Sequence, residues 1–138
     1  LKLPTRSKSL FKNNIEELFR LGAASIHPNK TFKSFKSIPV KIKKFDDFNF
    51  ENKIKFVKID VEGHEIEVIN GAKETIKKDK PIMLIEIEKR HSQRSVEDSI
   101  MLIKEHGYKC YYVKDKKLTS VDNLANKDSE NNYFFLPI

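Results

Sequence analysis

The sequence is poor in cysteine and lacks the motifs of several common enzyme classes. Cys110 is the only cysteine among 138 residues, so an internal disulfide is excluded. It lies in the apolar run "YKCYYV" with no evident base or metal ligand nearby in sequence, which predicts a buried, inert thiol. The motifs HExxH, CxxC and G-x-S-x-G are absent. Zinc protease and serine hydrolase chemistry therefore lacks its residues.

Long apolar runs are also lacking. No stretch approaches the roughly 20 apolar residues that cross a bilayer, and the first residues show no signal-peptide pattern. We therefore expect no membrane span and a cytoplasmic location. The composition, 38% hydrophobic and 34% charged, is typical of a globular chain. A length of 138 residues predicts a single domain over residues 1–138.

The net charge of +7 raises the question of a nucleic-acid partner. The lysines are scattered along the chain and mixed with acids, as in "ETIKKDK" and "VKDKKL". This distribution favours solvated faces over a dedicated nucleic-acid site. A basic nucleic-acid-binding domain is kept as an alternative, and it predicts steeply salt-dependent affinity.

The chain divides into an irregular part, to about residue 50, and a regular α/β part over residues 54–138. In the first part, "IPVKIKKF" alternates apolar and polar residues and predicts a strand over 38–45. In the second part, apolar spacing predicts helices over 64–78 and 95–107, with Ser95 as the cap of the second helix. Apolar runs predict four strands, over residues 54–60, 81–87, 108–113 and 131–138. The first strand, helix and second strand form a βαβ unit, which joins parallel strands.

Carboxylates follow two neighbouring strands of this predicted sheet. Asp60 and Glu62 come at the end of the first strand, and Glu86 and Glu88 come at the end of the second. Ligands of parallel sheets bind beyond the carboxyl ends of the strands, and Gly63 allows a sharp turn there. The acids would suit a metal site, a general base or acceptors for ligand hydroxyls. The simpler alternative is that Asp60 and Glu62 only cap the following helix.

Two basic residues bear on this cluster. Lys58 lies inside an apolar strand, where an unpaired charge is costly, and we expect it to form an ion pair with Glu86. His91 follows the second strand and is expected at the rim of the same site, although a solvated histidine is the simpler alternative. A metal-dependent nuclease would suit the acids, but "EIEK" places Glu88 where that class carries lysine. We therefore assign no metal ligands.

Several longer stretches of the sequence resemble those of one known protein family. "FVKIDVEGHEIEVINGA", followed by "KPIMLIEIE", resembles the signature of the FkbM-type methyltransferases. "LGAASI" with "IPVKIKKFDDF", and "GYKCYYV" with "NNYFFLP", resemble the flanking segments of that family. The resemblance implies a methyltransferase that uses S-adenosyl-L-methionine. It also implies O-methylation of a sugar or other secondary-metabolite hydroxyl, with a small-molecule or glycan acceptor.

The resemblance further implies a fold and site residues. The fold is the class I methyltransferase (Rossmann-like) three-layer sandwich, with strand order 3-2-1-4-5-7-6 and the last strand antiparallel. The four strands of the regular part would then form a partial sheet, 4-5-7-6. Asp60 and Glu62 match the acids beside the pocket where donor meets acceptor, and Asp60 is favoured as the base. We expect Gly63, Glu86 and His91 to line this pocket.

One family feature is lacking in this sequence. The glycine-rich turn that holds the donor has no counterpart, because the four glycines, Gly22, Gly63, Gly71 and Gly107, nowhere form G-x-G. We therefore expect a truncated or split chain without the donor-binding half of the fold. Such a chain should bind S-adenosylmethionine poorly and be inactive alone. Strand 54–60 would then be an edge, which predicts self-association or pairing with a partner chain. The alternative from a different class is a non-catalytic half-domain that pairs with such a partner.

Overall fold

The computed structural model describes residues 2–4, 35–91, 94–124 and 129–138. The chain divides into two compact units, residues 1–42 and 43–138, and each is described by itself. In the first unit, strand β1 (Lys2–Pro4) pairs antiparallel with β2 (Phe35–Ser37).

The strand predicted over residues 38–45 is wrong. Residues 38–44 have no regular secondary structure, and Phe45–Asp47 form the short 3-10 helix η1. Among the described residues, no core covers these alternating apolar side chains, since Val40 is 49% exposed and Ile42 is 79% exposed. Pro39 also removes a backbone donor that a strand would use.

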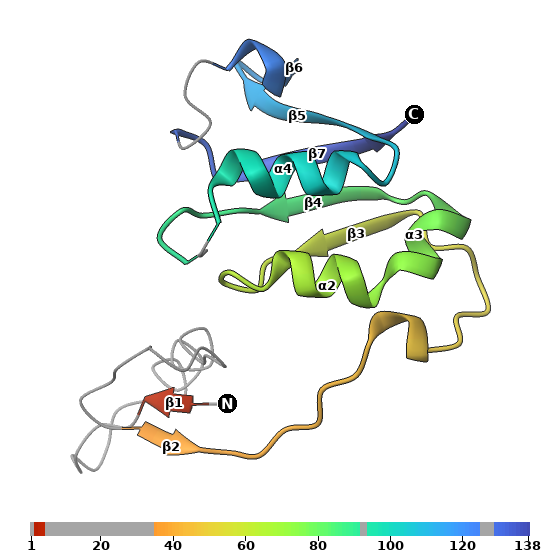
Figure 1. Ribbon diagram of the computed structural model, residues 1–138, viewed down its shortest axis with the longest axis vertical. Helices are drawn as coiled ribbons and strands as arrows, with labels where there is room; N and C mark the ends of the chain where they lie inside the picture. Colours follow the sequence, from red (N-terminus) through yellow and green to blue (C-terminus); the bar gives the residue numbers. More distant parts are fainter. Residues whose placement is uncertain (1, 5–34, 92–93, 125–128) are drawn as a thin grey trace. The chain divides into compact units, whose positions relative to one another are not determined.

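A mixed five-stranded sheet forms the centre of the second unit (Figure 1). Parallel strands β3 and β4 lie at one side, and β7 runs antiparallel to both of its neighbours, β4 and β5. The order across the sheet is β3 (Phe56–Ile59), β4 (Ile82–Glu86), β7 (Asn132–Pro137), β5 (Tyr108–Lys114) and β6 (Lys117–Ser120). The four predicted strands all form, and their ends differ from the prediction by at most two residues.

Strand β6 was not predicted. It forms a hairpin with β5 through Asp115 and Lys116, which both have positive φ, at 50° and 63°. That backbone geometry is the one favoured in two-residue hairpins, but it usually carries Asn-Gly or Asp-Gly. The turn was not predicted because its second position carries lysine where glycine is usual.

In the described part of residues 43–138, three helices cover one face of the sheet (Figure 1): α2 (Glu65–Gly71), α3 (Lys73–Asp79) and α4 (Val96–Lys104). The single helix predicted over 64–78 is two helices, because the chain leaves helical geometry at Ala72. The predicted cap is confirmed, since Ser95 Oγ accepts a hydrogen bond from Asp98 N at 3.0 Å. Among the described residues, no helix is both long enough and apolar enough to span a membrane.

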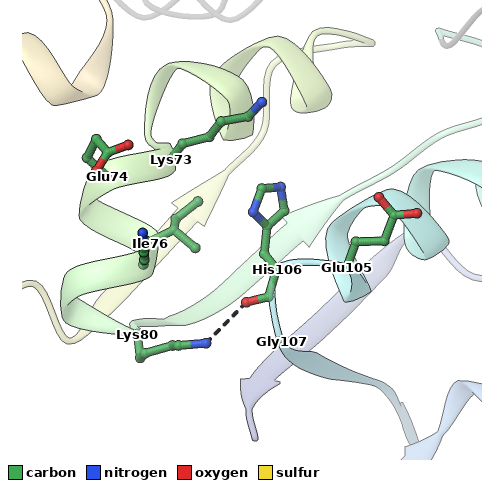
Figure 2. Close-up of a pocket in the computed structure, with 8 residues that line it drawn as sticks. Lys73, Glu74, Ile76, Lys80, Glu105, His106 and Gly107 are labelled. Carbon is green, nitrogen blue, oxygen red and sulfur yellow. Dashed lines mark hydrogen bonds between the residues drawn. The ribbon is translucent and has the colours of Figure 1, made fainter.

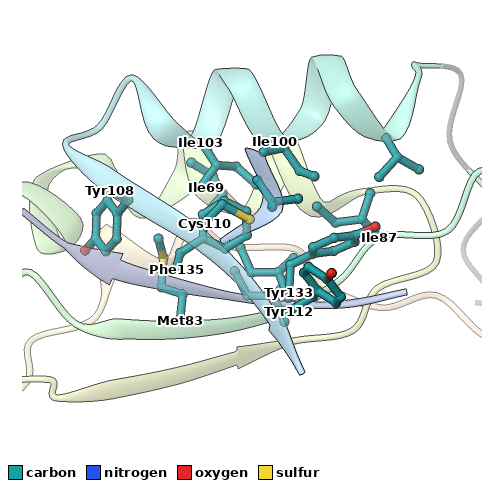
Figure 3. Packing of buried hydrophobic residues seen from close by; sticks show 14 of the residues in the cluster. Ile69, Met83, Ile87, Ile100, Ile103, Tyr108, Cys110, Tyr112, Tyr133 and Phe135 are labelled. Carbon is teal, nitrogen blue, oxygen red and sulfur yellow. The ribbon is translucent and has the colours of Figure 1, made fainter. Parts of the chain in front are cut away.

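The core lies between these helices and the sheet (Figure 3). Met83, Ile85, Tyr133 and Phe135 are fully buried there. Cys110 is also buried, and burial raises the pKa of its thiol to about 12. The prediction of an inert thiol is thus confirmed, because almost no reactive thiolate exists at neutral pH.

The opposite side of the sheet is here called the open face, since within the described part of residues 43–138 no helix covers it. Several of its apolar side chains are exposed, including Phe56 at 53%, Ile82 at 40% and Val113 at 49%. Phe56 and Ile82 are neighbours in the parallel register. The described residues therefore form two layers, and the site described next lies at one end of this open face.

Candidate functional site

The predicted acids converge at the carboxyl ends of β3 and β4. Ile59 lies beside Ile85 in the parallel register, and both point into the core. Successive strand residues point to opposite faces, so Asp60 and Glu86 follow on the open face. A small pocket of about 80 Å³ is present there. Its lining residues are Asp60, Glu62, Glu65, Glu86, Glu88, Arg90 and His91.

The turn after Asp60 is held by Gly63. Glu62 and Gly63 both have positive φ, at 49° and 95°. A Cβ at Gly63 would lie 2.1 Å from the backbone oxygen of His91, so only glycine fits between the two loops. Glu65, which is 4% exposed, accepts a hydrogen bond from Gly63 N at 2.8 Å. The sequence analysis missed this role of Glu65, although an acid in the first helical turn can reach back to cap the preceding turn.

Glu88 is the most heavily bonded acid of the pocket. It accepts hydrogen bonds from Arg90 Nε, from Arg90 Nη2 at 3.1 Å and from Asn131 Nδ2 at 3.1 Å. His91 Nδ1 lies 3.3 Å from the same carboxylate. The hydrogen bonds from Arg90 hold the pKa of Glu88 below its ordinary value, although partial burial opposes them. Glu88 therefore stays ionised, and its oxygens are already occupied by these partners.

Glu86 is shifted in the opposite direction. Partial burial raises its pKa, and the negative charges of Asp60 and Glu88 raise it further, while Lys58 opposes them. A hydrogen bond between the two carboxyl groups of Glu86 and Glu88 acts in the same direction on Glu86. Neighbouring acids whose pKa values are pushed apart are typical of sites that handle protons.

The expected ion pair between Lys58 and Glu86 is wrong. Lys58 Nζ pairs with Asp60 Oδ2 at 3.0 Å, within its own strand. Lys58 lies beside Leu84 in the register and points to the open face, where its side chain is 54% exposed. The premise of a buried lysine fails, because only one face of this strand is covered. Asp60 is 46% exposed, so its carboxylate is accessible to a ligand.

The structure thus places Asp60, Glu62, Glu86 and His91 in one pocket, with Gly63 in the turn that shapes it. Arg90 and Asn131 were not predicted. Among the described residues, no group of three or more His, Cys, Asp or Glu side chains is arranged to hold a metal ion.

A larger pocket, of about 510 Å³, lies at the opposite end of the strands (Figure 2). It is formed where α3 ends before β4 and where α4 ends before β5. Its residues are Lys73, Glu74, Ile76, Lys77, Lys80, Glu105, His106 and Gly107. Lys80 Nζ donates a hydrogen bond across it to the backbone oxygen of His106, at 3.2 Å. The acidic pocket and this pocket of mixed charge therefore lie at opposite ends of the strands.

The parallel βαβ unit within a mixed sheet makes this an α/β protein. Folds with such units bind their ligands beyond the carboxyl ends of the strands, where the acidic pocket lies. Comparison with known families specifies the class. Residues 8–110, about three quarters of the chain, match the model of the methyltransferase FkbM domain. The chain therefore belongs to the FkbM methyltransferase domain family, as the sequence resemblance predicted. The matched segment includes every residue that lines the acidic pocket. No curated protein and no solved structure matches the chain.

Proposed function

We propose that this chain acts in the S-adenosylmethionine-dependent methylation of a hydroxyl group on a sugar or other secondary metabolite. Family membership supports methyl transfer. The choice of a hydroxyl acceptor rests on the pocket at the ends of β3 and β4, where neighbouring carboxyl groups shift each other's pKa values. In this proposal β3, β4, β7 and β5 correspond to strands 4, 5, 7 and 6 of the class I fold, and their observed neighbour order supports the assignment.

Asp60 is the acid best placed to act as general base. Its carboxylate is about half exposed, and Lys58 Nζ lies 3.0 Å from it. Glu88 is 10% exposed and already accepts hydrogen bonds from Arg90 and Asn131, so it orients its neighbours instead. Asp60 would accept the proton of the acceptor hydroxyl as the oxygen bonds to the methyl carbon. Such positioned bases contribute about 10²- to 10⁴-fold to rates.

The remaining pocket residues position the acceptor. Glu62 and Glu86 offer carboxyl oxygens to further hydroxyls, and His91 lies at the rim, held by Glu88. When bound, S-adenosylmethionine supplies a methyl group on a positively charged sulfur. The negative pocket suits that charge, because opposite charges attract more strongly where water is partly excluded.

The acidic pocket fits only the reacting end of the donor. Its volume of about 80 Å³ is well below the roughly 300–1,000 Å³ of sites that enclose a whole cofactor. The small volume and the lack of a G-x-G turn support weak donor binding by the chain alone. They also favour the second candidate, a half-domain that completes its donor site with a partner chain. Isothermal titration with S-adenosylmethionine distinguishes the two, because tight binding to the isolated chain would contradict the half-domain.

The test of the proposed function is methyl transfer to a panel of hydroxyl-bearing sugars, followed as S-adenosylhomocysteine formation. In whatever turnover the chain shows at saturating S-adenosylmethionine, Asp60→Asn should lower kcat by roughly 100-fold or more, because the amide cannot accept the proton. Glu105→Gln is the matched control, since Glu105 is an exposed acid at the opposite end of the strands. Unchanged kcat in Asp60→Asn would remove Asp60 as the base. No turnover with any acceptor would favour the half-domain.

A further inference from the structure

His91 lies where the two loops of the acidic pocket meet, and its backbone is held from both sides. Its N–H donates a hydrogen bond to Glu88 O at 3.1 Å. Its carbonyl oxygen packs against Gly63, where a Cβ would lie only 2.1 Å away. The imidazole lines the pocket, and the side chain is 27% exposed. Backbone contacts thus place the ring at the pocket and leave it accessible to a ligand.

The carboxylate of Glu88 determines which ring nitrogen of His91 carries the proton. Glu88 Oε2 lies 3.3 Å from His91 Nδ1. The hydrogen bonds from Arg90 hold the pKa of Glu88 below its ordinary value, so this carboxylate is ionised at neutral pH. A lone pair on Nδ1 would repel the carboxylate, whereas an N–H there is attracted to it. The neutral form of His91 should therefore carry its proton on Nδ1 and use Nε2 as a hydrogen-bond acceptor.

Glu88 is fixed in turn by Arg90 and Asn131. Arg90 donates hydrogen bonds to both carboxylate oxygens, from Nε and Nη2. Asn131 Nδ2 donates to Glu88 Oε1 at 3.1 Å. Asn131 is itself anchored, because its backbone oxygen accepts a hydrogen bond from Ile87 N at 2.8 Å. Arg90 and Asn131 are therefore positioning residues, which hold the carboxylate within reach of His91.

We infer that His91 selects the methyl acceptor, because its Nε2 accepts a hydrogen bond from a second hydroxyl next to the one that is methylated. This inference rests on the proposed function, in which Asp60 receives the proton of the first hydroxyl. The second hydroxyl keeps its proton and donates it to Nε2 as a hydrogen bond. The ligand class is then a vicinal diol, such as a sugar with two adjacent free hydroxyls.

The lining of the pocket favours such a ligand. Asp60 and His91 share a pocket of only about 80 Å³, so the two hydroxyls that they receive must lie close together. The described cations nearby, Lys58 and Arg90, are already paired with acids. Most lining groups are carboxyl groups, which only accept hydrogen bonds when ionised. A diol supplies two donors and its methylated product supplies one fewer, so the pocket should hold the product less tightly.

Nitrogen NMR of the imidazole rings tests the first step without methyl donor or acceptor. At a pH where the rings are neutral, His91 should carry its proton on Nδ1. His106, in the larger pocket, is the internal control, since no described carboxylate forms an ion pair with its ring. Glu88→Gln should weaken the Nδ1 preference, because an amide offers one oxygen acceptor where the carboxylate offered two. Glu86→Gln is the matched control, since His91 forms its described ion pair with Glu88 alone.

Sugars of the acceptor panel test the second step by binding and by rate. Without the methyl donor, a sugar with adjacent hydroxyls should shift the Nε2 signal of His91, and its fully methylated derivative should not. In turnover, replacing the second hydroxyl with methoxy should lower kcat/KM by roughly 10- to 100-fold, as expected for one lost hydrogen bond. His91→Phe should remove this difference between the two sugars, because phenylalanine has no Nε2. A merely structural role would lower both rates and keep their ratio.

Three results would overturn the inference. They are a neutral His91 protonated on Nε2, an Nε2 signal that no sugar of the panel moves, and a His91→Phe variant that still discriminates between the two sugars. Failure of the proposed function is distinguishable, because the NMR measurements involve no methyl transfer. A chain that binds diols at Nε2 but forms no S-adenosylhomocysteine would count against methyl transfer by the chain alone and leave the diol site standing.

Discussion

The two faces of the central sheet differ sharply, although the same strands make both. On β4, Met83 and Ile85 are completely buried beneath the helices, whereas Ile82 is 40% exposed. At the end of the strand and just after it, Glu86 and Glu88 alternate with buried Ile85 and Ile87. Because successive residues point to opposite faces, one short sequence serves both. The covered face stabilises the fold, and the open face presents the acids and the exposed apolar side chains.

The largest expected effect comes from comparing one residue type on both faces of β4. Ile85→Ala should lower the free energy of unfolding by about 2–5 kcal/mol, because it leaves a cavity in the core. Ile82→Ala should change it by less than about 1 kcal/mol, because that side chain is 40% exposed and its loss leaves no enclosed cavity. Urea denaturation of both variants measures the difference. Equal losses would mean that the open face is covered in solution and that the contrast between the faces is wrong.

A smaller effect is expected from the turn that shapes the acidic end of the open face. Gly63→Ala should destabilise the fold by about 1–3 kcal/mol, because φ is 95° and the new Cβ would lie 2.1 Å from His91 O. Gly107→Ala is the matched control, with φ of 84°, but its new Cβ would contact only the terminal atom of a long side chain, Lys80 Nζ, at 2.8 Å. It should lose about 1 kcal/mol from the backbone alone. Urea denaturation measures both variants. If Gly107→Ala lost more unfolding free energy than Gly63→Ala, the close backbone contact between Gly63 and His91 would not be what fixes the site.

The covered face and the acidic cluster could be predicted from the sequence because both depend on local patterns. Apolar runs of strand length located four of the strands, and serine with an acid three residues later located the start of α4. The convergence of Asp60 and Glu86 followed from parallel pairing, which a βαβ unit requires. Only the neighbourhood of each residue was needed for these predictions.

The remaining features depend on contacts between distant segments, or on which face is left uncovered. Asn131 reaches Glu88 because β7 lies beside β4, and 43 residues separate the two in the sequence. The wrong partner for Lys58 came from assuming that both faces of β3 are buried. Likewise, the alternation in residues 38–45 has the period of a strand, but Val40 and Ile42 are exposed. The spacing of apolar residues indicates which face of a segment could be buried. It does not indicate whether another element packs against that face.

The smallest expected effect distinguishes Glu86 from Glu88, the two acids on the open face at the end of β4. Glu86 has a raised pKa, so its stabilising protonated form is complete below the ordinary value of 4.5 and is lost as pH rises through the folded value. Glu86→Gln should therefore be slightly more stable than the unaltered chain at pH 7, within about 0.5 kcal/mol, and equal to it in acid. Glu88 has a lowered pKa, so its ionised form stabilises the fold above 4.5, and this is lost as pH falls through its folded value. Glu88→Gln should consequently be less stable at pH 7 and approach the unaltered chain in acid. Denaturation curves across this pH range should give opposite signs for the two variants, and the same sign would mean that the pocket does not separate the two acids.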